Sequence, residues 1–424
     1  MSDRILRSAL SALLLVGTLA GCKEQISGNL GCPELCTDES AEVRDTVLVG
    51  SIVIDSTLIG FPRPGEDRDI TMWNNVDTAD VRIIARFDSL PINYQVIGAS
   101  SDSLIRRVDS AALIFTVDTL RQKATLPITV DAYDVDTTAA DSVTSALFPL
   151  FRPDRLIGSQ TFTAADFKAD TLRLALDNAA LFAKIKDTLR LRVGLRVRGQ
   201  GAARLRIAAN SFFPRIRMRV AADTSIKPDT VAPRSKSPAA DATLQGLYSY
   251  YKIVGAGALP VPQSGRVAIG GLSGARTYLR FDIPPMVLDS VQVIRASLLL
   301  TQTKPRSTGA FVDTLTVFTQ PVLAAPTVTD IFTASQFLGG ARAYGVDSVR
   351  FAARDSGLKS IELVNLVRFW KQVGGANSSR SIVLRALEEG ATPAEVNIFS
   401  NEGPVGDRPR LRLTYVPRHG FGIP

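Results

Sequence analysis

Apolar and polar residues alternate along many short segments of this chain. Segment 189–198 has an apolar residue at nearly every second position and four arginines between them, namely Arg190, Arg192, Arg196 and Arg198. Segment 215–220, Arg-Ile-Arg-Met-Arg-Val, repeats the pattern. Successive side chains of a strand point to opposite faces, so this alternation predicts strands with one buried and one wet face. Many such strands, separated by Pro, Gly, Asn and Asp, predict an all-β fold of antiparallel, jelly-roll-like sandwiches.

A helical period is clear in one segment and weaker in a second. Leu363, Leu366, Val367 and Trp370 follow the spacing i, i+3, i+4 and i+7, which gives a helix one apolar stripe. Segment 177–185 is its weaker counterpart in the first half of the chain. We therefore expect one short helix in each half.

Four sequence blocks occur twice in the same order. The matching blocks are 83–88 and 277–282, 108–116 and 293–301, 128–130 and 315–317, and 214–218 and 409–413. The two members of a pair are separated by 293 − 108 = 185 to 409 − 214 = 195 residues. This repetition predicts a tandem duplication of a domain of ordinary size. The expected domains are 46–220, a diverged first copy, and 247–417. Segment 221–246, rich in Pro, Ser, Thr and Ala, is expected to be the linker between them.

The N-terminus has the features of an export signal. Arg4 and Arg7 precede an apolar run, 9–20, which is too short to span a membrane. The run ends in Leu19-Ala20-Gly21-Cys22, which resembles a bacterial lipobox. We expect residues 1–21 to be a lipoprotein signal peptide, Cys22 to be lipidated, and 22–45 to be a tether; an ordinary signal peptide is the alternative. Lipid chains would make the membrane a partner.

The residue after Cys22 bears on location. It is Lys23 rather than an aspartate that would favour inner-membrane retention, so the outer membrane or cell surface is expected. Cys32 and Cys36 can form a small disulfide in such an oxidising place. Their C-x-x-x-C spacing differs from the C-x-x-C of redox enzymes.

Residues suited to catalysis are scarce. The chain has a single histidine, His419, in the expected tail 418–424, and three cysteines. These numbers exclude a histidine-rich zinc site and a four-cysteine site. No nucleophile elbow and no phosphate-binding loop occurs. We therefore predict no catalytic residue, no metal site and no cofactor.

The second half resembles the DNRLRE domain family. The resemblance rests on Tyr278-Leu279-Arg280-Phe281-Asp282, on 296–300, on the helix ending in Phe369-Trp370, on 398–402 and on the closing block 408–415. It covers most of 245–417 and implies a jelly-roll sandwich without catalytic activity. Some relatives of that family are carbohydrate-binding modules for acidic polysaccharides. The first half departs from the pattern, with Ala208-Ala209-Asn210-Ser211 where the second half has Ser400-Asn401-Glu402.

Arginines on alternating positions are the main candidate for a binding site. Nine of them are expected to share one sheet face if their three strands are neighbours, namely Arg190, Arg192, Arg196, Arg198, Arg204, Arg206, Arg215, Arg217 and Arg219. Guanidinium groups bind carboxylate or sulfate with two hydrogen bonds, so this face would suit an anionic polymer. The alternative is a solvated face balanced by acids on adjacent strands. No aromatic residues accompany the arginines, which argues against nucleic acid.

A second, weaker candidate is a run of aspartates at Asp131, Asp134, Asp136 and Asp141. Calcium takes about six to eight oxygen ligands, often from such a loop. The EF-hand glycine and distal glutamate are missing, so a strand end followed by a turn is the alternative.

Three functions follow from these patterns. The leading hypothesis is a non-catalytic, lipid-anchored envelope protein that binds an extracellular or cell-wall polysaccharide, of anionic type. The second is a structural envelope lipoprotein with no glycan ligand, whose protein partners the sequence does not name. The third, least favoured by the sequence, is a polysaccharide-degrading enzyme.

Overall fold

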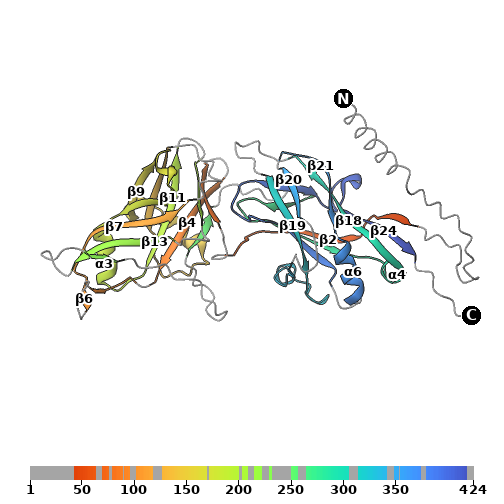
Figure 1. Cartoon of the computed structure of the whole chain (residues 1–424), viewed down its shortest axis with the longest axis horizontal. Coiled ribbons are helices and arrows are strands. Elements are labelled where there is room, and N and C mark those ends of the chain that lie inside the picture. The colour runs from red at the N-terminus through yellow and green to blue at the C-terminus, as the bar shows by residue number, and fades with distance from the viewer. Residues whose placement is uncertain are drawn as a thin grey trace, which may run out of the picture. The chain divides into compact units, whose positions relative to one another are not determined.

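The computed structural model describes the chain in segments that begin at Val43. The described residues are 43–63, 69–75, 79–88, 90–95, 102–117, 127–169, 171–199, 203–208, 214–221, 229–231, 250–255, 264–304, 314–340, 348–352, 354–373 and 379–417. Cys22, Cys32, Cys36 and His419 lie outside them. Within these segments, antiparallel strands dominate (Figure 1), which confirms the predicted all-β sandwich fold.

The first sandwich packs two antiparallel sheets against each other. One contains β3 (Asp69–Asn75), β4 (Ala79–Phe87), β8 (Ile128–Asp134), β9 (Leu156–Phe162), β11 (Leu191–Gly199), β12 (Ala203–Ala208) and β15 (Tyr250–Val254). The other contains β7 (Arg107–Thr116), β10 (Thr171–Leu176), β13 (Arg215–Ala221) and β14 (Asp229–Val231). A two-stranded ribbon joins β5 (Asn93–Gln95) and β6 (Asp102–Leu104). Both main sheets contribute to one buried core, through side chains such as Phe87, Leu113 and Met218.

The second sandwich has the same two-layer construction. One sheet contains β1 (Arg44–Leu48), β16 (Arg266–Gly270), β18 (Val291–Thr303), β21 (Gly357–Glu362), β23 (Glu395–Phe399) and β24 (Arg410–Pro417). The other contains β2 (Ile52–Leu58), β17 (Arg276–Phe281), β19 (Thr314–Val322), β20 (Ser348–Ala352) and β22 (Ser381–Ala386). Its separate core includes Phe281, Phe351 and Trp370.

Two of the described helices fall where the sequence predicts them. They are α3 (Asn178–Lys186) and α6 (Val364–Val373). The expectation of one helix per half is too low, because shorter helices also occur: α2 (Thr144–Leu147), α4 (Pro285–Asp289), α5 (Ile331–Ala334), and the 3-10 turns η1 (Phe148–Leu150), η2 (Pro153–Arg155), η3 (Asp166–Lys168) and η6 (Val405–Asp407). Among the segments described, no helix has the length and apolar character needed to cross a membrane.

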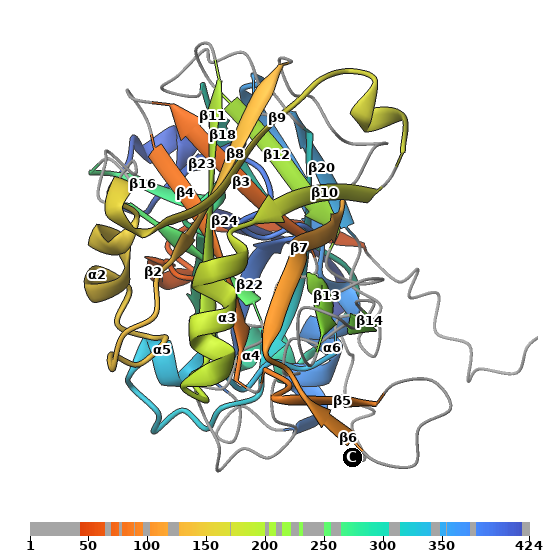
Figure 2. The ribbon, with the colours of Figure 1, turned by 90° about the vertical axis from the view of Figure 1, so that its left-hand side faces the viewer.

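Both predicted helices are fixed by a carboxylate at the start and by an apolar face. The Asp177 carboxylate accepts hydrogen bonds from the first free N–H groups of α3, and Leu181 and Ile185 enter the core. The Glu362 carboxylate accepts from Val364 N–H at the start of α6, and Trp370 is fully buried. Figure 2 shows α3 beside β7.

The two sandwiches share the order of their central strands. In the first, β7 lies between β10 and β13, and β11 lies between β4 and β8. In the second, β18 pairs with β21 and β24, and β22 lies between β17 and β19. The four repeated sequence blocks fall on the matching strands β4 and β17, β7 and β18, β8 and β19, and β13 and β24. Strand pairing therefore agrees with the predicted duplication.

A pair of strands from outside the repeated blocks completes each sandwich. In the second sandwich β1 pairs with β24 and β2 with β17. In the first, β14 and β15 hold the equivalent places beside β13 and β4. β1 and β2 precede the first sandwich in the chain, so the first sandwich is an insertion within the second.

This arrangement corrects the predicted domain boundaries. Segment 46–58 was expected in the first domain, yet its strand β2 pairs with the second. Segment 221–246 was expected to be an interdomain linker, yet β14 lies within it and pairs with β13 of the first sandwich. Segment 247–417 was expected to be the second domain, yet its strand β15 pairs with β4 of the first sandwich. Local composition could not predict these pairings, because the pairing of strands that are distant in sequence leaves no mark on it.

Candidate functional site

The arginines around β11 are neutralised by aspartates. Four pairs form, at distances of 2.7 to 3.0 Å between nitrogen and oxygen: Arg190 with Asp136, Arg192 with Asp141, Arg196 with Asp80, and Arg198 with Asp131. The antiparallel pairing of β11 with β8 places Asp131 opposite Arg196, and the Asp131 carboxylate meets the guanidinium of Arg198, two residues further along the same face of β11. The alternative of a charge-balanced face is therefore correct for this strand.

The same contacts account for the aspartate run. Asp131, Asp136 and Asp141 each meet an arginine, and Asp134 lies 2.9 Å from the ammonium group of Lys184. Burial raises the pKa of Asp131, but hydrogen bonds from Arg198 and Ser159 outweigh it and hold that pKa below the usual range. Within the described segments no group of three or more His, Cys, Asp or Glu residues is placed to hold a metal ion. These carboxylates act as ion-pair partners.

One of these pairs lies in the interior. Asp141 is fully buried and meets Arg192 at 2.8 Å, Arg86 at 2.5 Å and the Tyr251 hydroxyl at 3.0 Å. Burial, with the neighbouring Asp141 charge, raises the pKa of Tyr251, so its hydroxyl stays a donor. Tyr251 belongs to β15, so this network fixes β15 to the first sandwich. Arg192 is only 1% exposed, which removes it from any ligand surface.

The predicted nine-arginine face does not form. β11 and β12 belong to one sheet but are separated by β3 and β4, while β13 belongs to the opposite sheet. Arg204 and Arg206 lie on β12, and their side chains fall outside the described structure. The prediction assumed that strands close in sequence are neighbours, which is wrong here.

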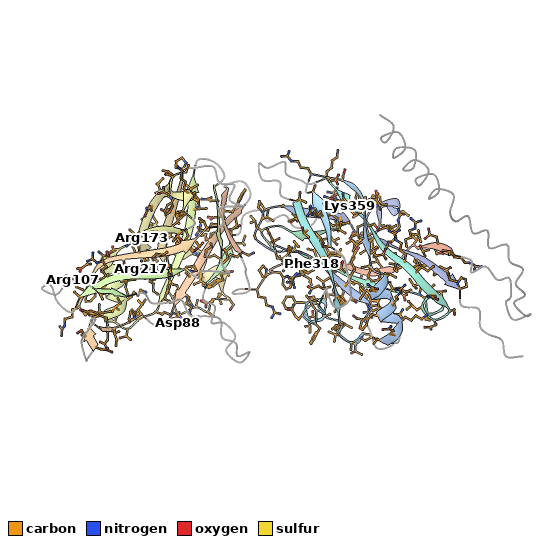
Figure 3. All side chains as sticks on the ribbon, viewed as in Figure 1. Asp88, Arg107, Arg173, Arg217, Phe318 and Lys359 are labelled. Atoms are coloured by element: carbon orange, nitrogen blue, oxygen red, sulfur yellow. The ribbon has the colours of Figure 1, made fainter. Side chains whose placement is uncertain are left out.

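A smaller basic surface remains on the outer face of the sheet that contains β13. Arg215, Arg217 and Arg219 are exposed, while Ile216, Met218 and Val220 between them are buried in the core. A fourth exposed arginine, Arg173 of β10, stands opposite Ile114, whose other neighbour is Arg215. We call these four residues the arginine face (Figure 3, which labels Arg173 and Arg217).

Small or uncharged residues of β7 separate the basic positions. Ala112 lies opposite Arg217, Ser110 lies opposite Arg219, and Ala175 of β10 lies on the other side of Ala112. Ala112 is almost fully buried although it belongs to the outer face, as expected beneath long arginine stems.

Among the described residues, three of the four members of the arginine face lack a carboxylate partner. In the part of the chain that the structure describes, no hydrogen bond or ion pair joins Arg173, Arg217 or Arg219 to a carboxylate. Arg215 already interacts with another group of the chain, so only Arg173, Arg217 and Arg219 are counted as available to a ligand. At one end of β7, Arg107 and Asp109 neutralise each other at 2.5 Å. Within the described segments, Arg173, Arg217 and Arg219 of the arginine face thus carry positive charges that no carboxylate neutralises.

Sequence reasoning missed Arg173. Its segment, Thr-Leu-Arg-Leu-Ala-Leu at 171–176, alternates in the same way as β13, and burial follows that alternation. The alternation was available in the sequence. The sequence did not show that β10 lies in the same sheet as β13, with only β7 between them.

On the outer face of the matching sheet in the second sandwich, two arginines are paired with acids, while Arg410 of β24 meets no carboxylate within the described segments. The Arg412 guanidinium donates to Asp45 of β1 at 2.9 Å, and Arg295 of β18 donates to Glu362 at 2.9 Å. The hydrogen bond from Arg412 holds the pKa of Asp45 below its usual range.

The Ser400-Asn401-Glu402 segment, which contributes to the family resemblance, has a structural role. Asn401 donates its backbone N–H to the Asp55 carboxylate and its side-chain amide to the Ile52 carbonyl, each at 2.5 Å. These bonds hold β2 in the second sandwich. Burial, with the nearby Glu402 charge, raises the pKa of Asp55.

Comparison with known proteins shows no family for this chain. No family model matches it, and no curated protein matches it. Among solved structures, the infectious bursal disease virus VP2 subviral particle is 10% identical and covers 87% of this chain and 77% of its own, with a TM-score of 0.11. The T13 particle of that virus is 11% identical, covers 87% of this chain and 75% of its own, and has a TM-score of 0.10. Scores this low carry no argument about fold or function.

Proposed function

We propose that this protein is a non-catalytic, lipid-anchored envelope protein that binds an anionic polysaccharide through the arginine face of its first sandwich. The observation that carries the proposal is the absence of carboxylate partners for Arg173, Arg217 and Arg219 within the described chain, whereas the arginines around β11 are all paired. The resemblance of the second half to the DNRLRE family supports a module without catalytic activity.

The chemistry of the arginine face suits carboxylate or sulfate groups on a polymer. A guanidinium group offers parallel N–H donors that match the two oxygens of either group. Each exposed contact is weak, about 0.2 to 1 kcal/mol, so useful affinity needs several contacts at once. A polymer that repeats its charge supplies them, and the neutral residues of β7 add no repulsion. Binding should weaken as salt is added.

Replacing two arginines tests the proposal. We expect Arg217→Ser with Arg219→Ser to weaken binding to polygalacturonate about tenfold, because two guanidinium contacts are lost. Affinity electrophoresis or calorimetry at low salt measures the change, with neutral dextran as the control polymer. A matched variant, Arg152→Ser with Arg354→Ser, removes the same charge from exposed positions elsewhere and should bind nearly as the parent does.

Two outcomes would contradict the proposal. Equal weakening by both variants would mean that net charge alone drives binding. If the parent binds neither polygalacturonate nor a sulfated polymer, the structural function becomes the better account.

The anchor is tested separately. Cys22 follows a charged start, an apolar run and a lipobox-like segment, so we expect Cys22→Ser to release the protein from membranes. Membrane pelleting and the mass of the mature protein measure the effect. If the variant pellets like the parent and has the same mass, Cys22 is not the lipidated residue.

A further inference from the structure

The register of the two sheets allows the arginine face to be compared with the second sandwich position by position. In the sheet that contains β13, Arg217 lies opposite Ala112 of β7, and Ala112 lies opposite Ala175 of β10. In the sheet that contains β24, the corresponding Arg412 lies opposite Ser297 of β18, and Ser297 lies opposite Glu362 of β21. An acid in the second sandwich thus replaces an exposed alanine in the first.

A second neutral-to-acidic difference lies on the other neighbours of these strands, β14 beside β13 and β1 beside β24. Arg219 of β13 stands opposite Thr230 of β14. The corresponding Thr414 of β24 stands opposite Asp45 of β1. The second sandwich therefore has carboxylates at two places where the first has neutral residues.

Both carboxylates are engaged with the basic residues of their own sheet. Asp45 accepts from Arg412, and Glu362 accepts from Arg295 and also from the Ser297 hydroxyl and the Ala296 N–H. Asp45 is 42% exposed and Arg412 54%, so this pair lies on the surface that a polymer would contact. A polyanion approaching it would have to displace one carboxylate and be repelled by the other.

We infer that the second sandwich carries a closed version of the arginine face, meaning one on which the carboxylates Asp45 and Glu362 neutralise basic residues. The chain then binds one polyanion, on the first sandwich. The inference rests on the proposed function. Asp45 and Glu362 pair with Arg412 and Arg295 on the second face, whereas the sequence of the first face has the neutral residues Thr230 and Ala175 at the corresponding places. The two copies of the duplicated domain thus differ in function through residues on the flanking strands.

Closing the first face is the direct test. Ala175→Glu with Thr230→Asp installs the acids of the second sandwich while all four arginines are kept. We expect polygalacturonate binding to weaken at least about tenfold. Thermal unfolding shows whether the double variant folds; if it does not, Ala175→Glu alone, at an exposed strand position, repeats the test.

Opening the second face is the complementary test. Asp45→Asn with Glu362→Gln removes both charges and keeps one hydrogen-bond-accepting oxygen in each side chain. With a defined oligogalacturonate, calorimetry should give a stoichiometry that rises from one to two per chain. When Arg217→Ser and Arg219→Ser are added, the binding that remains should belong to the second face.

The outcomes separate this inference from the proposed function. If the parent binds and the closed variant binds equally well, or the opened variant still binds one ligand, the inference is wrong and the function stands. If the parent binds no anionic polymer, both are wrong.

Discussion

A chain that begins at Ile59, and so lacks β1 and β2, should lose the fold of its second sandwich and keep that of the first. β1 covers the edge of β24, and β2 covers β17 and buries Ile52 in the second core. Their removal exposes two strand edges and opens that core, whereas residues 69–254 contain every strand of the first sandwich. Hydrogen exchange measures the result: amides of β17 and β24 should exchange rapidly and those of β7 and β13 slowly.

A chain that begins at Val43 is the matched control, since it keeps both strands. Adding a synthetic peptide of residues 43–60 to the shorter chain should restore protection of β17 and β24. If these strands stay protected without the peptide, β1 and β2 are not needed to complete the second sandwich.

Asp141→Ala should destabilise the first sandwich by about 3–5 kcal/mol, because it leaves Arg86 and Arg192 as buried charges without their shared carboxylate. Urea unfolding, followed through the first sandwich, measures the loss. Asp154→Ala removes the partner of Arg152 in a pair more than half exposed, and should cost less than about 1 kcal/mol. Similar losses in the two variants would contradict the structural role given to Asp141.

Local alternation was enough to predict strands but not their neighbours. The pattern of Arg215, Arg217 and Arg219 on β13 fixed which side chains share a face, and burial confirms it. The same reasoning placed Arg192 on a wet face, yet it is buried because Asp141 and the nearby Thr137 and Ala139 carbonyls surround its guanidinium.

Pairing between distant strands was the missing information. Asp131 and Arg198 are 198 − 131 = 67 residues apart, and only the register of β8 and β11 shows that two separate sequence candidates neutralise each other. The contribution of Arg173 and the balancing of Arg412 by Asp45 likewise depend on contacts between strands far apart in the chain.

The insertion of one sandwich into the other sets an order of events during synthesis. The first sandwich can close once residue 254 is available, whereas Arg44 must wait for Tyr415, which is 415 − 44 = 371 residues later. Contacts of such long range form slowly because a large loop must close first. Strands β1 and β2 are made before the first sandwich, yet they are among the last described strands to be paired. Until then the edges of β17 and β24 are open to other chains, so the final closure of the second sandwich is the step most exposed to aggregation.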